Sequence, residues 1–220
     1  MKTLYFDLIG GISGDMVVGA LLDLGVDFRG LSRELKKIKV SGYVLKKRSV
    51  SRGHVKATKF DVLVQKSANY SYQEIIRLVK QSKLSPEIKN NILKIYQVLC
   101  KAETKAHGHQ HGDINFEQLG DIDSFVDIAA ACICLDKMKV NGLYYSLIPL
   151  NKNIAPATTE LLLDKKMYFT NLIFENVTPT GMAILSALGK QLDHSLKSIL
   201  LMQRCGYGAG ALNPIEVSNV

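Results

Sequence analysis

The sequence contains no tryptophan, and aromatic residues make up only 7% of its 220 residues. Proteins that bind single-stranded nucleic acid stack the bases on aromatic side chains interleaved with basic ones. The short basic clusters Lys36-Lys37-Ile38-Lys39 and Lys46-Lys47-Arg48 contain no such aromatic side chains. We therefore expect no nucleic-acid partner, and interpret the basic residues as a solvated surface that is also compatible with an anionic small molecule.

Cysteines and long apolar runs are also scarce. The longest strongly apolar helical stretch, 128–135, is far shorter than the ~20 residues needed to cross a bilayer. Acidic residues interrupt the apolar N-terminal run at Asp7 and Asp15, and no small-residue cleavage site follows. The cysteines are too few and too irregularly spaced for a disulfide framework: Cys100, Cys132, Cys134 and Cys205. These absences predict a cytoplasmic protein with reduced thiols and no membrane partner.

The composition is otherwise that of an ordinary globular protein with a basic balance. Hydrophobic residues at 47% and charged residues at 22% exclude wholesale disorder. The chain has 28 Lys and Arg against 20 Asp and Glu, a formal net charge of +8 and a pI near 9.2. A chain of this length can bury the core of one domain or slightly more.

Hydrophobic periodicity predicts helices and short strands in alternation. Helix starts are indicated by Ser85-Pro86 and Thr178-Pro179, where a capping hydroxyl precedes a proline. The mixture predicts an α+β fold with a small mixed sheet flanked by helices. The expected strands are 3–9, 43–49, 54–64, 142–150 and 198–204, and the expected helices are 15–24, 27–39, 71–79, 85–104, 121–138 and 182–188.

The first segment that suggests chemistry is the glycine loop Gly10-Gly11-Ile12-Ser13-Gly14, between a strand and a helix. Such a loop presents backbone N–H groups and a helix N-terminus, which suit a phosphate or carboxylate. It matches neither the Walker A nor the GxGxxG pattern. Asp7 and Asp15 flank the loop and are expected to lie close enough to hold a metal. The alternative is a tight turn in which Ser13 or Asp15 caps the helix.

The second segment is His107-Gly108-His109-Gln110-His111, which holds three of the five histidines. Alternate residues of an extended segment project to one side, so the three imidazoles can converge on one ion. Imidazole suits zinc, nickel and copper. The alternative is an exposed polar loop.

The third segment begins a helix with two carboxylates four residues apart, Asp123 and Asp127. Like charges at this spacing share a helix face and repel one another unless a cation or a hydrogen-bond donor joins them. Asp121 and Asp123 can instead complement the helix dipole.

The fourth segment, Thr178-Pro179-Thr180-Gly181, is a hydroxyl-rich helix start like Ala155-Pro156-Ala157-Thr158 upstream. Its hydroxyls can donate hydrogen bonds to a ligand, and ordinary helix capping explains them equally well.

Together these segments resemble the LarC family of nickel-insertion proteins, which mature the nickel-pincer cofactor of lactate racemase. The resemblance covers nearly the whole chain, and its most specific part is the run 11–25. The matching residues follow in order: Asp7, Gly11-Ile12-Ser13-Gly14-Asp15-Met16, Gly19-Ala20-Leu21-Leu22-Asp23-Leu24-Gly25, Ala102-Glu103, His107, Gly120, Asp123-Ser124, Val126-Asp127-Ile128, Pro156-Ala157-Thr158, Glu160-Leu161-Leu162, Thr178-Pro179-Thr180-Gly181 and Gly206-Tyr207-Gly208-Ala209-Gly210.

The resemblance implies a CTP-dependent cyclometallase, a nickel-inserting lyase. Such proteins insert nickel into pyridinium-3,5-bisthiocarboxylic acid mononucleotide, forming one nickel–carbon and two nickel–sulfur bonds. This anionic substrate fits the glycine loop and the positive net charge. We therefore predict three groups of site residues: catalytic Asp7, Asp15, Asp123 and Asp127; cofactor-binding Gly11, Ser13, Gly14, Thr178 and Thr180; and nickel-binding His107, His109 and His111.

The chain departs from the family pattern at three places. The family shows a His-Phe-His-Glu run where this chain has Asn115-Phe116-Glu117-Gln118, and a longer stretch with a His-Gly pair before Pro156. The family also continues beyond the position of Val220 into a C-terminal domain associated with CTP and a divalent cation, magnesium or manganese. We expect a family-like N-terminal domain at 1–210 and the start of a missing C-terminal domain at 211–220.

The expected function is that of a truncated or split subunit that needs a separate C-terminal partner for CTP. The alternative is a diverged, catalytically inactive metal- or anion-binding module. The sequence is also compatible with a homo-oligomer.

Overall fold

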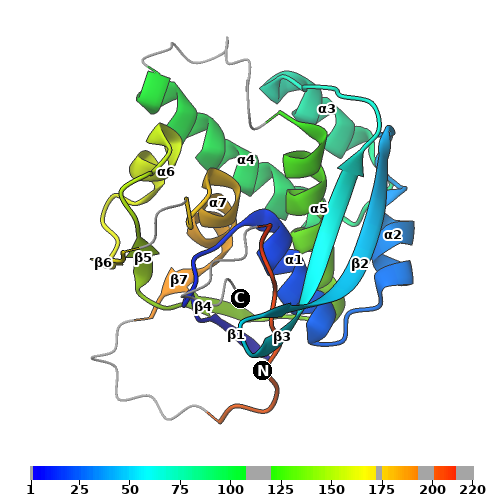
Figure 1. The fold of residues 1–220 in the computed structure, drawn as a ribbon. Coiled ribbons are helices and arrows are strands. Elements are labelled where there is room, and N and C mark those ends of the chain that lie inside the picture. Colours follow the sequence, from blue (N-terminus) through cyan, green and yellow to red (C-terminus); the bar gives the residue numbers. More distant parts are fainter. Residues whose placement is uncertain (1, 108–119, 172–174, 193–200, 212–220) are drawn as a thin grey trace.

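A computed structural model describes residues 2–107, 120–171, 175–192 and 201–211. Helices form most of the regular structure in these residues, and the strands are short (Figure 1). This confirms the α+β class predicted from the sequence. The helices are α1 (Gly14–Asp23), α2 (Phe28–Leu35), α3 (Tyr72–Gln81), α4 (Pro86–His107), α5 (Ile122–Met138), α6 (Pro156–Leu161) and α7 (Pro179–Leu188).

The described strands form three small sheets. The first has the parallel order β1-β4-β7, the second is the antiparallel hairpin β2-β3, and the third is the parallel pair β5-β6. The strands are β1 (Thr3–Phe6), β2 (Tyr43–Arg52), β3 (Val55–Val64), β4 (Gly142–Tyr145), β5 (Ile148–Leu150), β6 (Met167–Phe169) and β7 (Lys190–Gln191). Parallel and antiparallel pairing both occur, but in separate sheets.

Two expected strands differ in the structure. The expected strand 142–150 is divided into β4 and β5, which pair with different neighbours. Of the expected strand 198–204, residues 201–204 have no regular secondary structure, and residues 198–200 lie outside the described residues. Both segments are apolar enough to read as single strands, and only their partners decide how far each one extends.

Helix α5 forms the centre of the hydrophobic core, where it packs against α1, α2 and α4. Every residue from 128 to 135 is buried, which explains why this stretch of the helix is apolar on all sides. Cys132 and Cys134 are part of this core, and burial raises the pKa of the Cys134 thiol to about 12. None of the described helices is long and apolar enough to cross a membrane.

Glycines allow helix α1 to approach two other backbone segments closely. A Cβ atom at Gly19 would lie 2.4 Å from the Thr58 carbonyl oxygen, and one at Gly208 would lie 1.9 Å from the Met16 carbonyl oxygen. The segment 206–210 pairs with β3 through two hydrogen bonds to the backbone of Thr58. The Thr58 N–H donates to the Tyr207 carbonyl, and the Thr58 carbonyl accepts from the Ala209 N–H. Residues near the two ends of the described chain are therefore packed together.

Candidate functional site

A pocket of about 490 Å³ lies where helices α1, α5 and α7 begin and where strand β3 passes them. Residues from six separate segments of the sequence line it, between residues 13 and 211. The structure brings together seven of the predicted site residues here: Ser13, Gly14, Asp15, Asp123, Asp127, Thr178 and Thr180.

The glycine loop joins the start of α1 to the start of α7. The Ile12 N–H donates to the Asn176 carbonyl at 2.7 Å, and the Thr178 N–H donates to the Ile12 carbonyl at 2.9 Å. Gly11 has a φ of 113°, and a Cβ atom there would lie 1.8 Å from the Asn176 carbonyl oxygen. Only glycine fits this position, because the backbone is left-handed and the neighbouring backbone at Asn176 is too close. Gly11 is not among the residues that line the pocket.

Gly14 leaves room for the side chain of Asp127. A Cβ atom at Gly14 would lie 2.8 Å from both Cβ and Oδ2 of Asp127, and 2.9 Å from Cγ2 of Thr180. A larger residue at position 14 would therefore push the Asp127 carboxylate and helix α7 away from α1.

The buried Asp127 carboxylate has too few hydrogen bonds and nearby cations to offset the loss of water around it. Its Oδ1 atom is buried and has no hydrogen-bond partner in the described structure. Burial raises the pKa of Asp127 well above its ordinary value, and the nearby carboxylates of Asp15 and Asp123 raise it further. The Lys59 ammonium and the backbone N–H of Asp15 act in the opposite direction without cancelling the effect. Asp127 therefore holds a proton more tightly than an ordinary aspartate.

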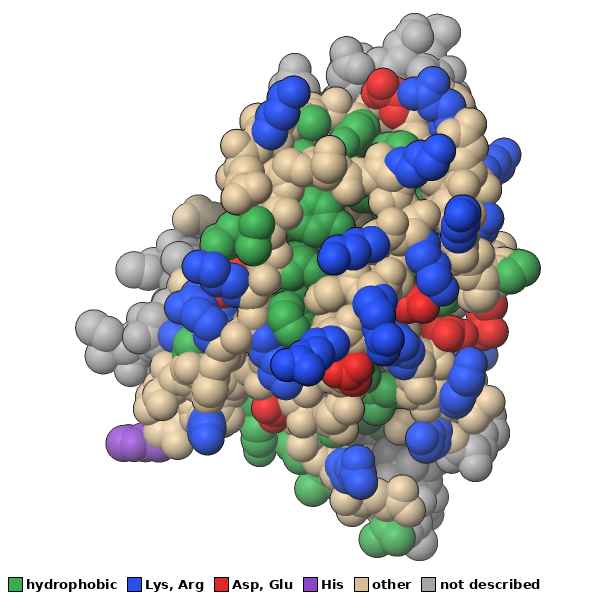
Figure 2. Space-filling model, turned by 90° about the vertical axis from the view of Figure 1, so that its right-hand side faces the viewer, with side chains coloured by type: hydrophobic (Ala, Val, Ile, Leu, Met, Phe, Trp, Pro, Cys, Tyr) green, Lys and Arg blue, Asp and Glu red, His purple; other side chains and the backbone are tan. Residues whose placement is uncertain are grey.

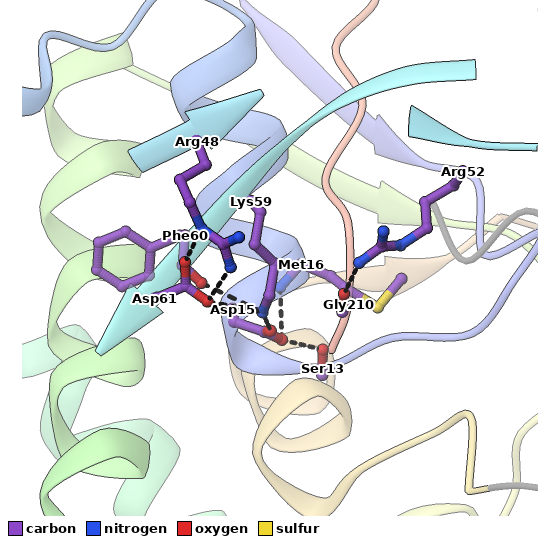
Figure 3. A network of polar contacts seen from close by, with 9 residues as sticks. All are labelled: Ser13, Asp15, Met16, Arg48, Arg52, Lys59, Phe60, Asp61 and Gly210. Atoms are coloured by element: carbon purple, nitrogen blue, oxygen red, sulfur yellow. Dashed lines mark hydrogen bonds and ion pairs between the residues drawn. The ribbon is translucent and has the colours of Figure 1, made fainter. Parts of the chain in front are cut away.

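Asp15 is held at the start of α1 by three donors (Figure 3). The Ser13 hydroxyl and the Met16 N–H, at 2.9 Å, donate to Oδ1, and the Lys59 ammonium donates to Oδ2. The Asp15 N–H is directed to Asp127. Carboxylates of the chain itself thus occupy two backbone donors of this helix start. The Ser13 side chain makes no capping hydrogen bond. Asp15 instead accepts a hydrogen bond from a backbone N–H at this end of the helix, that of Met16.

Lys59, in the middle of β3, is one of the pocket residues that the sequence did not predict, as are Asp61, Glu175 and Asn176. Its side chain is only 7% exposed, and its ammonium pairs with Asp15 and lies 3.7 Å from Oδ1 of Asp61. A buried lysine requires such partners, because an unpaired buried charge is costly. The alternation of Lys59 and Asp61 in the sequence is the only local signal, since Asp15 lies 44 residues away.

Asp61 connects Lys59 to the outer strand β2. The Arg48 guanidinium donates to both of its carboxylate oxygens, at 2.8 and 3.1 Å (Figure 3). Burial alone would raise the pKa of Asp61, but the hydrogen bonds from Arg48 and the charge of Lys59 lower it below its usual value. Asp61 therefore remains ionised between two cations.

The lining of the pocket is acidic, although the whole chain is basic. Lys59 is the only lysine or arginine among the described lining residues, against five carboxylates: Asp15, Asp61, Asp123, Asp127 and Glu175. Asn176 also lines the pocket, and its Oδ1 atom is buried without a partner in the described structure. The pocket thus offers oxygen atoms and negative charge to a cation.

Thr178 and Thr180 begin helix α7 beside the pocket. The Thr178 hydroxyl accepts a hydrogen bond from the Gly181 N–H at 3.2 Å, which is an ordinary N-cap. Thr180 is buried. Capping therefore accounts for Thr178, and a role in ligand binding stays a prediction for both residues.

The remaining predicted site residues do not line this pocket. Asp7 is exposed just after β1. His107 ends α4, where its Nε2 atom lies 3.2 Å from Oε2 of Glu103, and this end lies beside α6, on the far side of α7 from α1 (Figure 1). His109 and His111 lie outside the described residues. Within the described parts of the chain, no three His, Cys, Asp or Glu side chains are grouped so as to hold a metal ion.

Comparison with protein families gives a match over nearly the whole chain. The model of the family described as "Nickel insertion protein" matches residues 4–220. No solved structure matches the chain.

Individual relatives carry names of the same kind. A protein of Syntrophobacter fumaroxidans named for nickel insertion is 39% identical, over 96% of this chain and 56% of its own length. The pyridinium-3,5-bisthiocarboxylic acid mononucleotide nickel insertion protein of Geobacillus kaustophilus is 35% identical, over 100% of this chain and 58% of its own length. The chain therefore spans a little over half the length of these relatives.

Proposed function

The chain belongs to the nickel insertion protein family, and from this premise we propose that its pocket is where nickel enters a pyridinium mononucleotide. The observation that carries this proposal is the meeting of Asp15, Asp123 and Asp127 in one pocket of about 490 Å³. That volume is within the range of small-molecule sites, which is about 300–1,000 Å³.

The charge of the pocket suits the reacting end of this substrate. Nickel arrives as a dication and is attracted by the carboxylates of the pocket. The ring carries one positive charge and two anionic thiocarboxylates, so it becomes net cationic, and suited to the acidic lining, once it holds the nickel ion. The two thiocarboxylates at ring positions 3 and 5 supply sulfur ligands, which nickel accepts readily. A cargo ion that is passed to such a ligand needs few protein ligands.

Insertion of nickel also requires removal of a proton. When nickel bonds to C4, the ring carbon between the two thiocarboxylates, the C4–H bond breaks and its electron pair forms the nickel–carbon bond. The proton must pass to a base. We assign this role to Asp127, because a carboxylate with a raised pKa is a stronger proton acceptor than an ordinary one.

Three further features of the proposal come from the family. We propose that the segment containing His107, His109 and His111 delivers nickel to the pocket. We propose that the reaction uses CTP with magnesium or manganese, held by a part that corresponds to the remaining length of the relatives. The product would then be the nickel-pincer cofactor of lactate racemase, and the enzyme would be classed as a lyase.

Mass spectrometry of the small-molecule product tests the proposed function. The chain is incubated with nickel, the bisthiocarboxylic mononucleotide and CTP, with and without the separately produced C-terminal portion of the Geobacillus relative. We expect a product in which one nickel ion has replaced protons of the substrate. Unchanged substrate in both mixtures, with the intact Geobacillus protein active in parallel, would refute insertion by this chain.

A binding module without catalysis is the second candidate function. It is favoured by the lack of a preformed metal cluster in the described residues. The same experiment separates the two candidates, because a binding module would retain the mononucleotide on gel filtration and release it unmetallated.

A further inference from the structure

Positive charge is concentrated in one stretch of this chain. Twelve of the 28 Lys and Arg residues lie between residues 28 and 66, together with only two acidic residues, Glu34 and Asp61. This stretch forms α2 and the β2–β3 hairpin, and Figure 2 shows basic side chains spread over that side of the molecule. The rest of the chain has slightly more acidic than basic residues, so the net charge of +8 belongs to this side.

One face of the hairpin brings part of this charge to the pocket. In the register of the two strands, Lys46 lies opposite Asp61, and Arg48 lies opposite Lys59. Residues directly opposite each other in an antiparallel pair share a face. Asp61 and Lys59 both line the pocket, so Lys46 and Arg48 lie next to these two residues on the same face, just outside the lining itself. We call Lys46, Arg48 and Arg52 the hairpin rim.

The contacts of the two arginines confirm this placement. Arg48 donates to Asp61, and Arg52 donates to the Gly210 carbonyl at 2.9 Å; both partners line the pocket (Figure 3). Arg48 remains 56% exposed despite its ion pair. Lys46 is exposed and forms no ion pair within the described residues. After Asp61 is counted, the hairpin rim keeps a surplus of positive charge.

The two sides of the pocket thus favour opposite charges. Asp123, Asp127 and Glu175 would repel an anion, whereas the hairpin rim attracts one. We propose that the hairpin rim is the subsite for the phosphate monoester of the mononucleotide, which directs the ring with its bound nickel ion toward the acidic side. This rests on the proposed function. Arginine and lysine donate charge-assisted hydrogen bonds to phosphate, and these are stronger than neutral ones.

Nicotinic acid mononucleotide and its riboside test this subsite, because they differ only in the phosphate. Calorimetric titration without nickel compares the chain with the variant Lys46→Gln/Arg48→Gln and with the control Lys36→Gln/Lys39→Gln, which removes the same charge from exposed positions after α2. We expect the chain to bind the mononucleotide at least about 10-fold more tightly than the riboside, as one or more charge-assisted contacts would give. This preference for the mononucleotide over the riboside should fall below about 3-fold in Lys46→Gln/Arg48→Gln, which we call the rim variant, and should not fall in the control.

A preference that survives in the rim variant, or falls equally in the control, would overturn the subsite. Because Arg48→Gln also removes one of the two cationic partners of Asp61, the single variant Lys46→Gln and a thermal melt accompany it. A folded Lys46→Gln variant with an unchanged preference would count against the proposal.

Two further arms identify the source of the phosphate and separate this proposal from the proposed function. Inorganic phosphate can stabilise the chain but not the rim variant, while nicotinic acid mononucleotide does not bind the chain. In that case the anion subsite stands, and a pyridine mononucleotide is the wrong ligand for it. If the rim variant loses affinity for CTP and keeps its preference for the mononucleotide, the subsite serves a triphosphate and the proposal is wrong. If neither phosphate nor the mononucleotide binds the chain, the subsite does not exist.

Discussion

The acidic side of the pocket and the basic hairpin rim differ in how their charges are held. Asp127 lies among other carboxylates with a buried oxygen atom that lacks a partner in the described structure, and its pKa is raised. Asp61, on the hairpin, lies between Arg48 and Lys59, and its pKa is lowered. Two aspartates that line one pocket therefore differ in proton affinity. The difference shows that burial and neighbouring charges, and not residue type or net charge, set the proton affinity of each carboxylate.

Removal of the reactive carboxylate should have the largest effect. In Asp127→Asn the side chain keeps its size but can no longer accept a proton. We expect the rate of nickel insertion to fall on the order of 1,000-fold, within the usual range for general acid–base catalysis. The measurement is the product mass as a function of time. Asp136→Asn, at the other end of α5, is the matched control and should retain full activity.

The next largest effect concerns the cation that joins the two sides. Lys59→Met would leave Asp15 without its buried partner, and we expect the free energy of unfolding in urea to fall by about 3 kcal/mol. The double variant Lys59→Met/Asp15→Asn removes both charges and should recover part of this loss. If the single and double variants are equally unstable, the two side chains are not coupled.

The pH dependence of stability should distinguish the two aspartates. The folded state favours protonated Asp127, so the wild-type chain loses stability as the pH rises from the ordinary value of 3.8 through the raised pKa. Asp127→Asn avoids this loss. It should therefore melt at a higher temperature than wild type near pH 7, and at the same temperature below pH 3.8.

Asp61 should show the opposite sign. Its lowered pKa stabilises the folded state above the ordinary value, and this stability is lost as the pH falls through the lowered pKa. Asp61→Asn should thus melt at a lower temperature than wild type near pH 7. Equal responses of the two variants would contradict the comparison.

The exposed side of the hairpin should contribute least to stability. Arg48 is largely exposed, and exposed ion pairs contribute little in water. We expect Arg48→Gln to change the melting temperature by no more than about 2 °C, less in high salt. A larger change would mean that Arg48 stabilises the fold of the hairpin in addition to its proposed role in binding the phosphate.

Local signals in the sequence were sufficient for most helices and for part of the site. The i and i+4 spacing of Asp123 and Asp127 and the Thr178-Pro179 start of α7 depend only on nearby residues. The termination of α1 just before Gly25, which has a φ of 108°, could be predicted for the same reason. Part of the site could be predicted from these helix starts, because the spacing of residues in a helix fixes which side chains share a face.

Long-range contacts account for what the sequence did not predict. The burial of Lys59 depends on Asp15, which belongs to a different element. The division of 142–150 depends on separate partners for β4 and β5, and the extended segment 206–210 depends on the edge of β3. No local pattern reports such partners, and the placement of the basic residues at the pocket rim required the register of the hairpin.

The packing of Gly208 against Met16 also has a consequence for the order of folding. The pocket contains residues from 13 to 211, so its walls are separated by nearly the whole described chain. Contacts between residues this far apart in sequence form late and slowly, because the intervening chain must first lose its conformational freedom. During synthesis, the Asp15 wall leaves the ribosome long before the 206–211 segment that closes on it. We therefore expect the pocket to be completed only when the 206–211 segment has packed against α1, so that an incomplete chain would expose its carboxylates without yet offering a binding site.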